Sequence, residues 1–136
     1  MYLNSLQLKN KTALVTGAGK GIGKACAIAL AEAGADLIIV SRTQQDLLSV
    51  QKTINKFKRK CTPIICDISN YDEIKKLFSQ INKLDVLVNN AGTNIPENFV
   101  KIKKKDMDYV VDLNLKAAFH IAQLSARIMQ KAKNRK

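Results

Sequence analysis

The chain has 136 residues, of which 46% are hydrophobic, and a formal net charge of +12 at pH 7. A chain of this size can bury one sizeable core, so we expect a single domain spanning residues 1–136. It has no signal-peptide pattern, no run of 18 apolar residues and no nucleic-acid motif, so we expect a cytoplasmic protein without a membrane span or nucleic-acid partner.

The first half of the chain alternates strand and helix patterns. Residues 12–16 form a short apolar run that ends at glycine, which predicts a strand. A helix is predicted over 23–33, ended by Gly34, and a second buried strand over 37–40. The inward face of that helix is expected to carry Ala25, Cys26, Ala29, Leu30 and Ala33.

The alternation continues through the second half. Thr43 can cap a helix that runs to Phe57, with Leu47, Val50, Ile54 and Phe57 inward, and residues 63–66 predict a third strand. Asn70 opens a helix with Ile74, Leu77, Phe78 and Ile81 at helical spacing. Residues 85–89 predict a strand buried on both faces. A polar, lysine-rich connection over 91–105 then leads into one long amphipathic helix over 106–129.

Alternating strands and helices with short connections are typical of a parallel sheet covered by helices on both faces. The fold class is therefore α/β, a Rossmann-type doubly wound sheet. The lysine clusters 103–105 and 131–136 are interpreted as solvated surface. Cys26, Cys61 and Cys66 are odd in number and lack the spacing of a zinc site, so we expect reduced structural thiols and no metal centre.

The stretch TGAGKGIGKA, residues 16–25, joins the first strand to the first helix. Backbone N–H groups and the positive end of a helix dipole converge at such a turn, which makes it an anion site. Ile22 breaks the pattern G-x-G-x-x-G, and Ala18 and Ala25 exclude a phosphate-binding P-loop. The run does fit T-G-x-x-x-G-x-G. The alternative is a glycine turn that only packs the helix on the strand.

Four stretches in order, TGAGKGIGKACAIALAEAGADLIIVSR, CDIS, LDVLVNNAG and VDLNLKAAF, resemble the N-terminal half of a classical short-chain dehydrogenase/reductase. The stretch NNAGTNIPE is similar in sequence to gluconate 5-dehydrogenase-like and 3-oxoacyl-carrier-protein-reductase-like members. The resemblance implies a sheet truncated to about four strands in the order 3-2-1-4. It also implies transfer of hydride between a nicotinamide cofactor and a small carbonyl or alcohol substrate.

The resemblance assigns cofactor contacts residue by residue. The diphosphate would lie against Thr16, Gly17, Gly21, Ile22 and Gly23. The second strand ends at Ser41 instead of the acid that would bind a ribose 2′-OH, and Lys20 and Arg42 stand near it, which favours NADP over NAD. The alternative is that Lys20 and Arg42 are ordinary surface cations.

Further positions match the family's adenine, ribose and catalytic motifs. Asp67 would receive the adenine amino group with Ile68 beside the ring, although an Asp after a strand can also be a helix cap. The amide of Asn90 would satisfy backbone groups where the chain leaves the fourth strand, and the small Ala91 and Gly92 would let the ribose approach. Asn114 matches the catalytic asparagine, whose backbone carbonyl holds a water of the proton relay; the alternative is an ordinary polar residue of the helix. Relatives often pair through the long helix, so a full-length protein is expected to be a homo-oligomer.

The family's proton donor is a Tyr-x-x-x-Lys pair preceded by a serine, positioned after a fifth strand. Tyr71 and Lys75 have that spacing but lie upstream on the third helix, which we interpret as coincidence. His120 has no partner at ligand or triad spacing. We therefore expect a fragment of an NADP-dependent oxidoreductase that is inactive alone. The alternative is a catalytically dead nucleotide-binding or interaction module.

Overall fold

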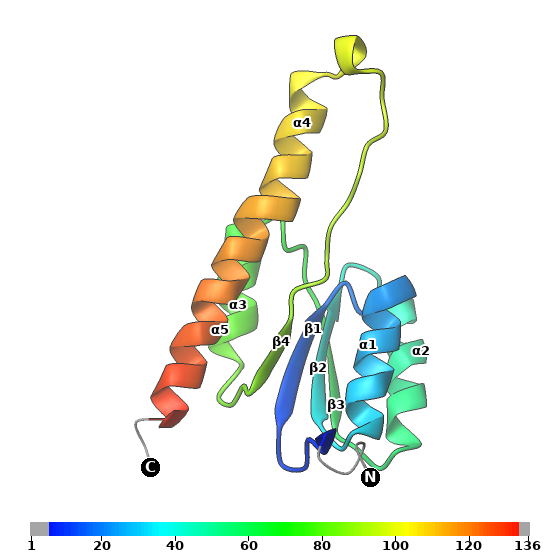
Figure 1. The fold of residues 1–136 in the computed structure, drawn as a ribbon, viewed down its shortest axis with the longest axis vertical. Coiled ribbons are helices and arrows are strands. Elements are labelled where there is room, and N and C mark those ends of the chain that lie inside the picture. The colour runs from blue at the N-terminus through cyan, green and yellow to red at the C-terminus, as the bar shows by residue number, and fades with distance from the viewer. Residues whose placement is uncertain (1–5, 134–136) are drawn as a thin grey trace.

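The computed structural model describes residues 6–133 and places a four-stranded parallel sheet, in the order β3-β2-β1-β4, between two layers of helices (Figure 1). This confirms the predicted fold class and strand order. The elements in chain order are β1 (Thr12–Thr16), α1 (Gly21–Glu32), β2 (Asp36–Ser41), α2 (Gln44–Asn55), β3 (Cys61–Ile65), α3 (Tyr71–Ser79), β4 (Val86–Val88), a 3₁₀ turn (Phe99–Lys101), α4 (Lys104–Val111), a π-helical segment (Asp112–Ala117) and α5 (Ala118–Lys133).

Strand β1 lies in the middle of the sheet, paired with β2 on one side and with β4 on the other. Its residues Ala13, Leu14 and Val15 have no exposed surface. Side chains of a strand alternate between the two faces, so burial of all three requires helices on both faces. The apolar run that follows Thr12 therefore marks the centre of the fold.

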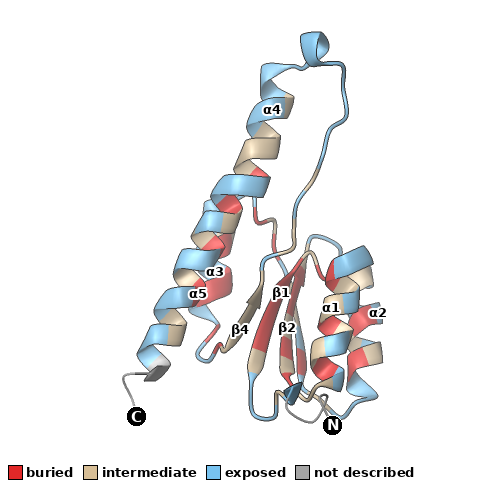
Figure 2. Ribbon diagram, viewed as in Figure 1, coloured by how far each residue is buried: buried red, intermediate tan, exposed pale blue. Residues whose placement is uncertain are grey.

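Each face of the sheet has its own core (Figure 2). Helices α1 and α2 cover one face, where Leu37, Ile39, Leu47, Val50 and Ile54 pack together. Helices α3 and α5 cover the other face, with a core that includes Leu14, Val40, Ile74, Leu77, Leu113 and Ile121. These two layers hold the carboxyl ends of all four strands along one edge of the sheet.

The predicted inward face of α1 is partly wrong, although Leu30 does pack against the core. The buried residues are Gly23, Ala27 and Ala31, whereas Ala25 and Ala29 are exposed. Small residues at i, i+4 and i+8 let the helix axis approach the sheet closely. Because the helix is apolar on several sides, its sequence period does not distinguish one face from another.

The helix termini differ from expectation at both ends of α2 and agree with it at the start of α3. Helix α2 ends at Asn55, before Phe57, which is 37% exposed. Thr43 precedes α2 but makes no side-chain capping hydrogen bond. Asn70 does cap α3, because its side chain accepts hydrogen bonds from the backbone N–H groups of the second and third helical residues.

Strand β4 is half-buried rather than buried on both faces, which corrects the prediction for residues 85–89. It forms an edge of the sheet, and among the described residues β1 is its only strand neighbour. Leu115 and Phe119 on the long helix are 65% and 60% exposed. An apolar edge strand and apolar side chains of the long helix therefore both lie on the surface.

The predicted long helix is continuous but not regular. It begins at Lys104, extends to Lys133 and contains the π-helical segment Asp112–Ala117. Together with the connection that follows β4, α4 projects beyond the carboxyl edge of the sheet (Figure 1). No helix within residues 6–133 is long and apolar enough to cross a membrane. The start of the chain and part of the basic tail 131–136 lie outside the described residues.

Candidate functional site

The glycine run forms the turn between β1 and the first turn of α1. Gly17 and Gly21 have positive φ values of 64° and 52°, a conformation that side chains with a Cβ disfavour. A Cβ on Gly23 would lie 2.2 Å from the carbonyl oxygen of Gly17, so this position requires glycine to let the helix begin against the turn. The sequence therefore selects a strand, a tight turn and a helix start within eight residues.

The first turn of α1 presents unused backbone donors. The first intrahelical bond runs from the Lys24 N–H to the carbonyl of Lys20, at 3.2 Å. The N–H groups of Gly21, Ile22 and Gly23 therefore have no acceptor within the helix. Lys20 occupies the N-cap position without a side-chain capping bond, and the first turn carries no acidic residue. A Cβ built on Gly21 would meet no atom within 4 Å, so open space lies beside these donors.

Thr16 and Asn90 join the glycine turn to the end of β4. The Thr16 hydroxyl oxygen accepts the backbone N–H groups of Asn90 and Ala91, at 3.1 and 3.0 Å. The Asn90 side-chain amide donates to the carbonyls of Thr16 and Gly17, at 3.1 and 3.4 Å. Thr16 is fully buried, so it holds the turn from the interior of the protein and does not face the open space.

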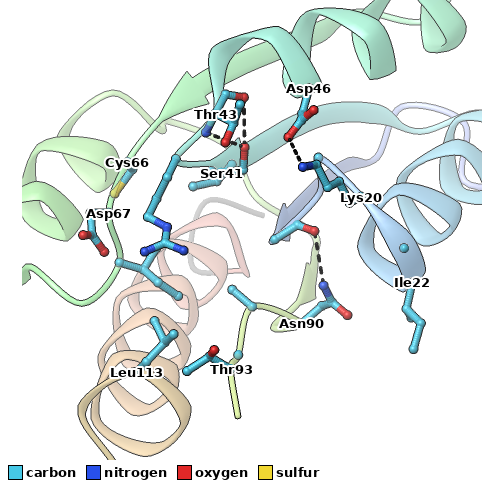
Figure 3. Close-up of a pocket in the computed structure, with 18 residues that line it drawn as sticks. Lys20, Ile22, Ser41, Thr43, Asp46, Cys66, Asp67, Asn90, Thr93 and Leu113 are labelled. Carbon is cyan, nitrogen blue, oxygen red and sulfur yellow. Dashed lines mark hydrogen bonds and ion pairs between the residues drawn. The ribbon is translucent and has the colours of Figure 1, made fainter. Parts of the chain in front are cut away.

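A cavity of about 650 Å³ opens at the carboxyl edge of the sheet (Figure 3). Its wall brings together eleven of the predicted site residues, from the four connections that follow the strands. They are Gly17, Lys20, Gly21, Ile22, Ser41, Arg42, Asp67, Ile68, Asn90, Ala91 and Gly92. Thr16, Gly23 and Asn114 are not part of the wall. The structure adds residues that sequence reasoning missed, namely Gly19, Val40, Thr43, Asp46, Cys66, Thr93 and Leu113.

The end of β2 forms a charged corner of the cavity. Ser41 accepts the backbone N–H of Thr43 at its hydroxyl oxygen, at 3.2 Å, which shapes the turn into α2. Lys20 Nζ lies 3.3 Å from Asp46 Oδ2, and Arg42 Nη1 donates to the hydroxyl of Tyr109 on α4, at 3.1 Å. Both predicted cations thus reach the corner, and each has a partner of its own.

Asp67 and Cys66 form the wall after β3. The Asp67 carboxylate accepts the backbone N–H and the hydroxyl of Ser69, at 3.0 and 2.8 Å, while Glu73 accepts the Asp67 N–H at 2.7 Å. Asn70, not Asp67, caps the following helix. Burial raises the pKa of the Cys66 thiol to about 11, with the negative charges of Glu73 and Asp67 acting in the same direction. The thiol is therefore neutral near pH 7 and contributes an apolar surface.

Asn114 lies in the π-helical segment and is exposed. Its amide forms a two-way bridge with Thr93: Nδ2 donates to the Thr93 carbonyl and Oδ1 accepts the Thr93 N–H, both at 2.8 Å. A Cβ on Gly92 would lie 3.1 Å from Asn114 Oδ1. The bridge fixes the connection after β4 against the long helix beside the cavity. A π-helical insertion is frequent at functional sites.

The chance Tyr-x-x-x-Lys pair stays outside the cavity. The Tyr71 ring lies 4.6 Å from the His120 ring, and Lys75 pairs with Asp72 at 2.7 Å. The hydrogen bond to Asp72 raises the pKa of Lys75 above its ordinary value. Neither residue lines the cavity wall. Within residues 6–133, no group of three or more His, Cys, Asp or Glu could hold a metal ion.

Comparison with known proteins finds a matching family and similar proteins. A family model described as short chain dehydrogenase matches residues 11–135. The chain is 33% identical over 133 residues to a 3-oxoacyl-acyl-carrier-protein reductase of Thermotoga maritima, covering 95% of this chain and 54% of that protein. The chain spans about half the length of the curated relatives it matches.

Two solved structures have a similar fold. A short-chain type dehydrogenase/reductase from Mycobacterium marinum superposes with a TM-score of 0.89 at 33% identity, covering 95% of this chain and 54% of that one. The Pseudomonas aeruginosa RhlG/NADP active-site complex superposes with a TM-score of 0.85 at 28% identity, covering 93% of this chain and 50% of that one.

Proposed function

The chain belongs to the short-chain dehydrogenase family, and we propose that its cavity binds NADP for hydride transfer between a secondary alcohol and a ketone. The observation that carries the proposal is the open space beside Gly21, which lies against three helix-start N–H groups without intrahelical acceptors. Such a helix start attracts an anionic group through its hydrogen-bond donors and its dipole. A dinucleotide diphosphate has the matching charge.

The wall also fits the remaining parts of the dinucleotide. Ser41, at the end of β2, leaves the ribose corner without the carboxylate that would repel a 2′-phosphate, and Lys20 and Arg42 lie beside it. Asp67 and Ile68, after β3, line the same wall, which supports their proposed contact with the adenine. The P. aeruginosa complex with NADP supports this cofactor by analogy. NAD is the alternative.

The other end of the cavity suits the nicotinamide side. Ala91 and Gly92 are small, so the second ribose can approach the backbone where the chain leaves β4. Asn114 holds this connection through its bridge to Thr93, and we propose that its backbone carbonyl orients a water of the proton relay. The bound cofactor supplies or accepts the hydride. The substrate class is a small molecule with a carbonyl or hydroxyl group.

A complete reduction also needs a group that protonates the developing alkoxide. The cavity wall formed by the described residues contains no tyrosine, and the one Tyr-x-x-x-Lys pair of the sequence lies elsewhere. We therefore expect the 136-residue chain to bind NADPH without turning over ketones. This same feature favours a second candidate, a nucleotide-binding module without catalysis.

Titration calorimetry of the folded chain with NADPH and NADH tests the proposal. We expect saturable binding of both, with NADPH the tighter ligand. Absence of heat with both coenzymes would refute the proposal. A panel of ketones with NADPH then addresses catalysis: oxidation of NADPH above the rate without protein would contradict the predicted lack of turnover. The expected lack of turnover agrees with both candidates, so the panel is repeated with any longer form that carries a Ser and a Tyr-x-x-x-Lys pair.

A further inference from the structure

Asp46 is a carboxylate on the wall of a cavity that we assign to an anionic cofactor. It lies in the first turn of α2 and its side chain is 26% exposed. Its Oδ2 atom is 3.3 Å from Nζ of Lys20, whose side chain is 80% exposed (Figure 3). The ion pair bridges the glycine turn and α2 across the corner where β2 ends.

The two side chains of this ion pair differ in how freely they can move. A Cβ on Gly19 would lie 2.9 Å from the Cβ of Asp46 and 3.2 Å from the hydroxyl of Ser41, so Asp46 is packed directly against the glycine turn. Its place in the first turn of a helix also favours its negative charge. Lys20, by contrast, is an exposed and flexible cation that can turn to another anion.

We propose that Asp46 sets the preference between NADP and NAD by competing with the 2′-phosphate for Lys20. The inference rests on the proposed function and deepens it. With Asp46 ionised, the corner holds Lys20, Arg42 and one carboxylate, a formal sum of +1. To bind, the 2′-phosphate of NADP must replace Asp46 as the partner of Lys20. It then lies beside the Asp46 carboxylate, which has lost its cation. NAD carries no 2′-phosphate and makes no such demand.

The direction of the effect follows from the charges. Removal of the Asp46 charge frees Lys20 and raises the formal sum of the corner to +2. NADP then binds more tightly, by about three- to tenfold at low salt, since unit charges several ångströms apart near a protein surface interact at this level. NAD binding changes by less than about twofold, because no charged group of NAD enters the corner.

Asp46→Asn is the matched test, because it keeps the size of the side chain that packs on Gly19. Asp46→Ser removes the same charge with a residue suited to a first helical turn, and the same direction is expected. Asp72→Asn is the control, since Asp72 also lies in a first helical turn and pairs with a lysine, Lys75, at 2.7 Å. Asp72 is not part of the cavity wall. Its substitution should leave both affinities unchanged.

Calorimetry on the whole chain measures the affinities for NADP, NAD, adenosine 2′,5′-bisphosphate and 5′-AMP. Both Asp46 variants should favour the two 2′-phosphorylated ligands, and this gain should be smaller when Lys20→Gln is added, because only the competition for Lys20 is then absent. A full gain in the Lys20→Gln background, or an unchanged NADP/NAD ratio in both Asp46 variants, would overturn the inference while leaving the proposed function intact. If the unmodified chain binds neither dinucleotide, the proposed function fails and the inference fails with it.

Discussion

Gly21→Ala separates the proposed diphosphate site from general effects on folding. Gly21 has a φ of +52°, a conformation that costs a residue with a Cβ about 1–2 kcal/mol. The new methyl group would touch no protein atom within 4 Å, so no further loss of stability is expected. It would instead project into the space assigned to the diphosphate. An extra methyl in a filled site costs about 1–3 kcal/mol, which weakens NADPH binding by a factor of about 5–150.

Gly34→Ala is the matched control for this prediction. Gly34 has a φ of +102° and follows the other end of α1, where a Cβ would lie 3.4 Å from Lys9. Urea unfolding should show that both variants lose stability, whereas calorimetry should show that only Gly21→Ala loses affinity for NADPH. Wild-type affinity in Gly21→Ala would refute the assignment of the diphosphate site. An equal loss of affinity in Gly34→Ala would show that the loss reflects folding alone.

Three further predictions concern groups that support the site. Thr16→Val leaves two backbone N–H groups without their acceptor and should lower the free energy of unfolding by about 2–4 kcal/mol, whereas Thr16→Ser should retain most of it; urea titration would contradict this if both variants matched the wild type. Burial acts to raise the pKa of Asp85, but hydrogen bonds from Thr12 and Lys11 outweigh it and hold that pKa below its ordinary value. The stability advantage over Asp85→Asn should thus be complete above about pH 4 and disappear as the pH falls through the lower native pKa, and a pH-independent difference would be inconsistent with it. Burial raises the pKa of Cys61 to about 12 and of Cys66 to about 11, so a thiol reagent at pH 8 should label Cys26 first and the other two only on unfolding; rapid labelling of all three in the folded chain would disagree.

The fold was predictable because its main signals are local. The apolar run of β1, the glycine turn and the cap at Asn70 each lie within a few residues of sequence, and the structure has all three. The face of α1 was not predictable from its period, since alanines occur on several sides and the closest approach selects Gly23, Ala27 and Ala31. The π-helical segment around Asn114 has no comparable local signal.

The site was predictable where the residues follow strands directly. Parallel strands present their carboxyl ends at one edge, so residues such as Ser41, Asp67 and Asn90 meet there. Asp46 was missed because it reaches the cavity from the first turn of a helix, five residues beyond the end of β2. The partner of Arg42 was also missed. Tyr109 lies 67 residues away in sequence, and only the position of α4 brings the two together.

Chemical-shift mapping of backbone amides during an NADP titration tests the central claim most directly. The claim is that the N–H groups at the start of α1 bind the diphosphate. It predicts that the amide signals of Gly21, Ile22 and Gly23 shift to saturation with one equivalent of NADP, while that of Gly34, at the other end of the helix, stays in place. Saturable binding that leaves these three signals unchanged would contradict the account.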